Sequence, residues 1–124
     1  MKVLQINSVC GVGSTGRIAT DIHKVLTDQG HTSYVAFGRD KPHSCDTAIR
    51  IGSPVDYYLH ALLTRLSDRH GFGSKTATTN FLKKVEGLSP DIIHLHNIHG
   101  YYINIQILFE YLKQKSIPVV WTLH

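Results

Sequence analysis

The stretch VLQINSVCGVGSTG, residues 3–16, decides the fold class. It begins with a short, mostly apolar run of the kind that forms a buried strand, and glycines that mark a turn follow. After Gly16, apolar residues recur at helical spacing until Gly30, a residue suited to end a helix. This order of strand, glycine-rich turn and helix is typical of an α/β domain.

The rest of the chain continues the alternation. Further strands are expected at residues 33–37, 47–51, 91–96 and 118–123. Helices are expected where apolar residues recur at spacings of three and four, from Pro54 to Leu66, from Ser74 to Ser89 and from Ile105 to Leu112. Strands separated by helices pair in parallel through right-handed crossovers. We therefore expect a Rossmann-like, doubly wound parallel sheet of about five strands in the order 3-2-1-4-5.

Length and composition limit the functional classes. The 124 residues are enough for one domain, and 42% of them are hydrophobic, so a core can form. The net charge of +4 favours anionic partners such as phosphates, nucleotides or acidic lipid surfaces, although ordinary surface lysine and arginine is the commoner explanation. No dense basic run with interleaved aromatic residues supports nucleic-acid binding. Two cysteines are too few for a disulfide scaffold.

The chain carries no recognisable targeting segment. Its first residues become polar too soon for a signal peptide, and no apolar run approaches the length that spans a membrane. We therefore expect a cytoplasmic protein, a location compatible with peripheral contact at the inner face of the membrane.

The chain ends one residue after an apolar strand, at His124. A parallel strand normally has both faces covered by neighbouring helices, and nothing follows this one. We therefore expect either a truncated part of a longer protein or a chain that another subunit completes. The isolated chain is expected to expose apolar surface beside the last strand and to associate with itself.

The first candidate site is the motif GVGSTG, which fits G-x-G-x-x-G with Gly11, Gly13 and Gly16. Glycines allow close backbone approach, and a helix start with free N–H groups, here at Ser14, suits a phosphate. Three interpretations remain open, namely a phosphate or sugar-phosphate contact, a dinucleotide site and a purely structural turn. A dinucleotide is disfavoured because residues 7–10 separate the strand from the first glycine, and because Asp40 lies beyond the second strand.

The second candidate site is the stretch HLHNIHGYY, residues 94–102. On a strand His94 and His96 share a face, but no carboxylate or cysteine accompanies them, so no metal site is expected. A hydrogen-bonding rim for a polyhydroxylated ligand is the better interpretation. Its expected members are His96, Asn97, His99, Gly100 and Tyr101. Tyr101 and Tyr102 are expected either to offer flat faces to a sugar ring or to pack at the helix entry.

The third candidate is His124, directly after the fifth strand. In the expected sheet, the loops after strands one, four and five all lie at one edge, where the strand order reverses. The turns at the opposite edge are short and chemically plain. This asymmetry predicts a binding rim at the carboxyl ends of the strands.

The chain resembles the N-terminal domain of family-4-type retaining glycosyltransferases with the two-Rossmann-domain GT-B fold. The resemblance covers essentially the whole chain. It is carried by the opening MKVLQIN, the glycine-rich loop, DQGH at residues 28–31, PDIIHLHN at residues 90–97 and PVVWTLH at residues 118–124.

The resemblance implies a domain that holds mainly the saccharide or lipid-linked acceptor, while a second domain binds the nucleotide-sugar donor. It implies catalysis in the cleft between the two without a metal or another cofactor. Gly13 and Gly16 would then belong to the loop that faces donor phosphates and acceptor. His96, Asn97 and His99 would line the acceptor side, and His124 would match the histidine that lies near the transferred sugar.

The resemblance stops short of a complete enzyme, because the donor-binding domain is absent from residues 1–124. The chain is expected to be inactive alone. Besides a glycosyltransferase fragment, three alternatives stay open. These are one subunit of a two-chain enzyme, a non-catalytic module that binds a sugar or nucleotide, and a nucleotide-dependent oxidoreductase, which the spacing of the first glycine disfavours.

Overall fold

The computed structural model of this chain describes residues 1–52, 62, 75–99 and 102–124. Its elements alternate between strand and helix, as the sequence predicts. In chain order they are β1 (Lys2–Ile6), α1 (Gly13–Asp28), β2 (Thr32–Phe37), β3 (Ala48–Arg50), α3 (Lys75–Leu88), β4 (Ile92–Leu95), α4 (Ile105–Lys115) and β5 (Val119–Trp121).

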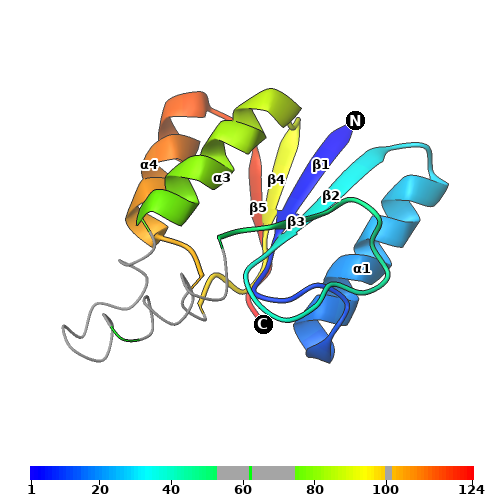
Figure 1. Cartoon of the computed structure of the whole chain (residues 1–124). Helices are drawn as coiled ribbons and strands as arrows, with labels where there is room; N and C mark the ends of the chain where they lie inside the picture. Colours follow the sequence, from blue (N-terminus) through cyan, green and yellow to red (C-terminus); the bar gives the residue numbers. More distant parts are fainter. Residues whose placement is uncertain (53–61, 63–74, 100–101) are drawn as a thin grey trace.

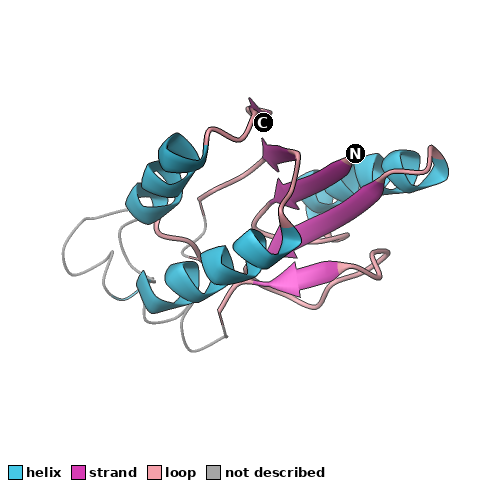
Figure 2. Ribbon diagram, turned by 90° about the horizontal axis from the view of Figure 1, so that it is seen from above, coloured by secondary structure: helices cyan, strands magenta, loops and turns pink. Residues whose placement is uncertain are grey.

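The five strands form one parallel sheet in the order β3-β2-β1-β4-β5, which confirms the predicted fold class and strand order. Helix α1 lies on one face of this sheet, and α3 and α4 lie on the other (Figure 1). Figure 2 shows the same arrangement from above. Because all strands run the same way, the segments that follow β1, β4 and β5 share one edge, and the carboxyl end of the chain lies there.

The side chains of β1 alternate between the two layers. Leu4 and Ile6 belong to the larger apolar cluster, which β1 shares with residues of β4, α3 and α4. Gln5 points to the other face, where its amide Nε2 donates to the carbonyl of Ala19 in α1 at 2.9 Å. The strand is therefore buried on both faces, as expected of the central strand of a doubly wound sheet.

Local signals explain where the helices begin and end. Helix α1 ends at Asp28, and Gly30 follows with φ of +85°, the left-handed conformation that glycine adopts without steric cost. The same helix begins at Gly13 rather than after Gly16, so Gly16 lies in its first turn. The helix predicted from Pro54 lies outside the described residues, apart from Leu62.

The last strand is exposed, as the sequence predicts. Val119, Val120 and Trp121 keep 42%, 50% and 46% of their surface accessible. β5 is also the terminal strand of the sheet, with β4 as its neighbour. Within the described ranges, none of the helices combines the length and apolar character needed to cross a membrane.

Candidate functional site

A cavity of about 230 Å³ lies where β4 and β5 end. It is lined by His96, Asn97, Ile98, His99, Trp121, Leu123 and His124. The structure therefore brings together four residues that the sequence marks as candidates, from two loops that are separated by a helix and a strand. The cavity has room for about one sugar ring or a similar polar group, and it is open to solvent.

His96 is the buried centre of this edge, with 2% of its surface exposed. Its Nε2 lies 2.7 Å from Oε1 of Gln5, and its Nδ1 lies 3.1 Å from Nε2 of His124. Its ring stacks on the ring of His94 at a centroid distance of 4.1 Å and on the ring of His124 at 5.4 Å. Both ring nitrogens of His96 are thus already engaged within the protein.

Burial controls the protonation of this cluster. Desolvation, followed by the neighbouring His94 and His124, lowers the pKa of His96 to about 4. Desolvation and His124 also lower the pKa of His94, whose Nε2 lies 2.7 Å from the hydroxyl of Thr122. His96 is therefore a neutral imidazole at physiological pH, with one N–H donor and one acceptor nitrogen.

Asn97 holds the loop after β4 in place through its backbone and its side chain. Its N–H donates to Oδ1 of Asn7 at 3.2 Å, and its Oδ1 accepts from the N–H of His99 at 3.0 Å. Asn7 in turn donates through Nδ2 to the carbonyl of Val9 at 2.9 Å and contacts the hydroxyl of Thr15 at 3.4 Å. Asn7 therefore connects the loop after β4 to the start of α1, a role that its sequence position did not reveal.

The glycine loop serves packing at two of its positions. A Cβ on Gly11, where φ is +77°, would overlap the carbonyl of His43, and a Cβ on Gly16 would lie 3.1 Å from the backbone nitrogen of Gly11. Gly13 has φ of +65° with open space around it, and Ser14 is exposed. Close packing thus explains two glycines of the motif. Gly13 and Ser14 are the positions where a phosphate would have access to the helix start.

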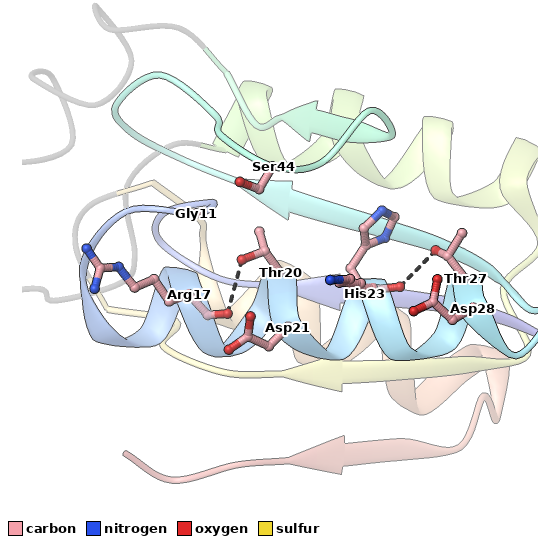
Figure 3. Close-up of a pocket in the computed structure, with 9 residues that line it drawn as sticks. Gly11, Arg17, Thr20, Asp21, His23, Thr27, Asp28 and Ser44 are labelled. Carbon is pink, nitrogen blue, oxygen red and sulfur yellow. Dashed lines mark hydrogen bonds between the residues drawn. The ribbon is translucent and has the colours of Figure 1, made fainter.

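A larger cavity, of about 560 Å³, runs from Gly11 along α1 (Figure 3). Charged and hydroxyl side chains line it, including Arg17, Thr20 and Lys24. His23 borders it, with Nδ1 2.9 Å from the hydroxyl of Ser33 and Nε2 3.5 Å from Asp46.

Ser33, His23 and Asp46 are the residue types of a hydrolase triad, but the serine is not accessible to a substrate. Ser33 is only 3% exposed, so its hydroxyl cannot reach a substrate, and the side chain of Asp46 is 91% exposed. We interpret this set as a contact that fixes α1 on β2.

The structure decides between the two interpretations of Tyr102. Its ring is 2% exposed and packs against Gly38, and its hydroxyl donates to the carbonyl of Asn97 at 2.6 Å. Tyr102 therefore packs at the helix entry and cannot offer a face to a sugar. Gly100 and Tyr101 lie outside the described residues, so their predicted role stays a prediction.

Trp121 is the aromatic residue that the sequence reasoning missed. It lines the cavity, keeps 46% of its surface exposed and donates through Nε1 to the carbonyl of His96 at 3.1 Å. Its ring also lies 5.9 Å from the ring of Phe109. The signal that could have found it is its position at the very end of the last strand, three residues before His124.

The histidines have protein partners that compete with a metal. His94 is paired with Thr122, and His96 is paired through both ring nitrogens. Among the residues that the structure describes, no group of three or more histidine, cysteine, aspartate or glutamate side chains is arranged to hold a metal ion. His94 and His96 thus direct their hydrogen bonds to groups of the protein itself.

Comparison with known proteins gives a relationship to a glycosyltransferase. No family model matches the chain. The chain is similar to the putative colanic acid biosynthesis glycosyl transferase WcaC of Escherichia coli (strain K12), at 24% identity over an alignment of 136 positions. The alignment takes in the whole chain and 33% of that protein, so the chain spans about a third of the relative's length. This similarity supports a relationship of the chain to glycosyltransferases.

Proposed function

We propose that the chain is the acceptor-side domain of a glycosyltransferase of the retaining, two-Rossmann-domain type. It would hold a saccharide or lipid-linked acceptor, while a nucleotide-sugar donor is bound by a second domain or a complementing subunit. The observation that carries the proposal is the cavity that joins His99, Trp121 and His124 at the carboxyl edge of the sheet. In open α/β sheets this edge is the usual place for a ligand.

The chemistry of the cavity suits a sugar better than a flat cofactor. Asn97 and His99 line it with polar groups, and the half-exposed ring of Trp121 offers an apolar face of the kind that packs on a pyranose. His124 is exposed and would contact the reacting sugar, which makes it the candidate catalytic residue. The similarity to WcaC, described as a glycosyl transferase, supports the same class of reaction.

The glycine loop would face the donor. Gly13 and Ser14 lie exposed at the start of α1, and no side chain caps this helix start. Its N–H groups and partial positive charge suit a donor phosphate. We propose that the loop contributes this contact, and that the chain works in the cytoplasm or at the inner face of the membrane.

The single tryptophan of the chain makes the proposal directly testable. Trp121 fluorescence should respond to a panel of neutral di- and trisaccharides. The backbone amide NMR signals of Asn97, His99 and His124 should shift in the same titration. Nucleotide sugars should instead shift the backbone amide signals of Gly13 and Ser14.

Two variants sharpen the experiment. His99→Ala should weaken saccharide binding several-fold, because His99 lines the cavity. His31→Ala, at the opposite edge of the sheet, is the matched control and should bind as the unmodified chain does. If no saccharide perturbs Trp121 or the edge signals, the chain holds no acceptor site. If nucleotide sugars bind tightly and saccharides do not, it is a nucleotide-binding module.

A further inference from the structure

A chain of hydrogen bonds crosses the sheet from α1 to the cavity. It runs from the carbonyl of Ala19 to Gln5, from Gln5 to His96, and from His96 to His124. The series begins at Gln5 in β1 and ends at His124, three residues after β5. Gln5 is fully buried in the central strand and His96 is 2% exposed, so solvent does not compete for the two bonds that Gln5 makes.

The donor and the acceptor of each hydrogen bond in this series follow from the first bond, at the carbonyl of Ala19. A backbone carbonyl only accepts, so the Gln5 atom that faces Ala19 is the NH₂ group, and the other amide atom is the acceptor Oε1. His96 must therefore donate to Gln5 through an Nε2 proton. A neutral imidazole that carries its proton on Nε2 accepts on Nδ1.

The last bond is then determined as well. Because Nδ1 of His96 is an acceptor, Nε2 of His124 must carry a proton and donate to it across 3.1 Å. The burial that keeps His96 neutral preserves this polarity at physiological pH. His124 itself is exposed and lines the cavity.

We propose that Gln5 and His96 are positioning residues that fix a proton on Nε2 of His124, so that Nδ1 is the acceptor of this ring in its neutral form. Nδ1 would then accept a hydrogen bond or a proton from a sugar hydroxyl in the cavity, and this last step rests on the proposed function. The inference also explains His96, whose two engaged nitrogens leave none for a ligand.

A polar residue in the centre of an apolar strand needs a physical reason. A buried amide costs free energy unless its groups are all bonded, and here both ends of Gln5 have partners. The bond from Gln5 to His96 joins residues 91 positions apart and fixes β1 to the end of β4. The stack of His94 on His96 restrains the ring from the other side. The arrangement therefore fixes both the orientation and the proton position of one exposed imidazole.

The direct test is imidazole NMR on the ¹⁵N-labelled chain. A hydrogen bond from Nε2 of His124 to Nδ1 of His96 should give a scalar coupling between these two nitrogens, and Nε2 of His96 should also be protonated. Absence of the coupling in a folded sample near pH 7, or a proton on Nδ1 of His96, would overturn the inference. This measurement needs no variant and no ligand.

Two variants test the role of Gln5. Gln5→Met keeps an unbranched side chain of similar length but removes the acceptor, so the coupling between His96 and His124 should be lost. His94→Phe keeps the ring stack and leaves the chain of bonds intact, so the coupling should persist. A coupling that survives Gln5→Met unchanged would show that Gln5 does not set the proton positions.

Saccharide titrations separate this inference from the proposed function. If the coupling is present but no saccharide binds, the positioning of His124 stands and the acceptor site is wrong. If saccharides bind to a chain without the coupling, the acceptor site stands and the positioning role is wrong. If both hold, Gln5→Met should weaken saccharide binding several-fold while His94→Phe leaves it within about twofold of the unmodified chain.

Discussion

Cys45 illustrates how a neighbouring thiol sets reactivity at the residue scale. A hydrogen bond from Cys10 is the main cause that lowers the pKa of Cys45, to about 6, while Cys45 and, after it, burial raise the pKa of Cys10. Cys10 is fully buried and Cys45 is partly exposed, so only Cys45 should react with a solvent reagent. The rate of alkylation by iodoacetamide should rise with a midpoint near pH 6 and level off by pH 7.

The variants of Cys10 test the cause of this shift. Cys10→Ala removes the donor and should move the midpoint toward the ordinary range of a cysteine, about 8.5. Cys10→Ser keeps a hydroxyl donor and should stay close to the unmodified chain. A midpoint that is the same with alanine as with serine would exclude the hydrogen bond from Cys10 as the cause.

His96 predicts how stability depends on pH. Its pKa is about 4 in the folded chain and near 6.5 when unfolded, so the unfolded chain binds more protons between these values. The contribution to stability is therefore complete above about pH 6.5 and is lost as the pH falls toward 4, by roughly 1–2 kcal/mol after solvent screening. Urea unfolding midpoints from pH 4.5 to 7 should show this slope, and His96→Phe should flatten it. Equal slopes in both proteins would contradict the assignment.

At the scale of the element, two glycines of the loop are required for different physical reasons. Gly11 combines positive φ with a carbonyl, that of His43, in the place of a Cβ, whereas Gly13 has positive φ and open space. Gly11→Ala should destabilise the fold by about 3 kcal/mol or more. Its alanine would be strained by the positive φ, and the backbone at His43 would also have to move. Gly13→Ala should cost only about 1 kcal/mol. Thermal unfolding of both variants measures the difference, and equal losses would show that the packing on His43 does not matter.

The strands and their order could be predicted because each is a continuous local signal. β1 and β4 are apolar runs of buried-strand length, and the helices between them carry apolar residues at helical spacing. Parallel order then follows from the alternation. The sequence pattern predicts the start of α1 after Gly16, because glycines are typical of loops, whereas the helix begins at Gly13. Gly13 has positive φ, and the sequence alone does not show whether a glycine of this kind belongs to a loop or begins a helix.

The candidate site could be predicted only in outline. The sequence placed His96, Asn97, His99 and His124 at one edge, because the carboxyl ends of parallel strands meet there. It could not show the bond from Gln5 to His96, since the partners are 91 positions apart and Gln5 resembles an ordinary strand residue. Whether Tyr102 or Trp121 meets solvent also depends on packing between elements. Spacing along the chain contains no such information.

At the scale of the whole molecule, the exposed face beside β5 predicts association. Val119, Val120 and Trp121 present apolar surface, and Leu123 is 80% exposed. A terminal strand with accessible backbone groups and apolar side chains is a ready template for another chain. The weight-average mass in sedimentation velocity should therefore rise with concentration. A single monomeric species at all concentrations would show that this face does not mediate self-association.

A pair of valine-to-lysine variants locates the contact. Val120 is 50% exposed on β5, and Val25 is 54% exposed on α1, at the other side of the molecule. A lysine at position 120 places a charge on the terminal strand, which opposes pairing with another chain, so Val120→Lys should shift the population toward the monomer. Val25→Lys adds the same charge elsewhere and should leave the distribution as it was. If both variants dissolve the assembly equally, net charge rather than the β5 face governs association. If only Val120→Lys does so, the surface that self-associates is the face formed by β5, immediately beside Trp121 and the cavity.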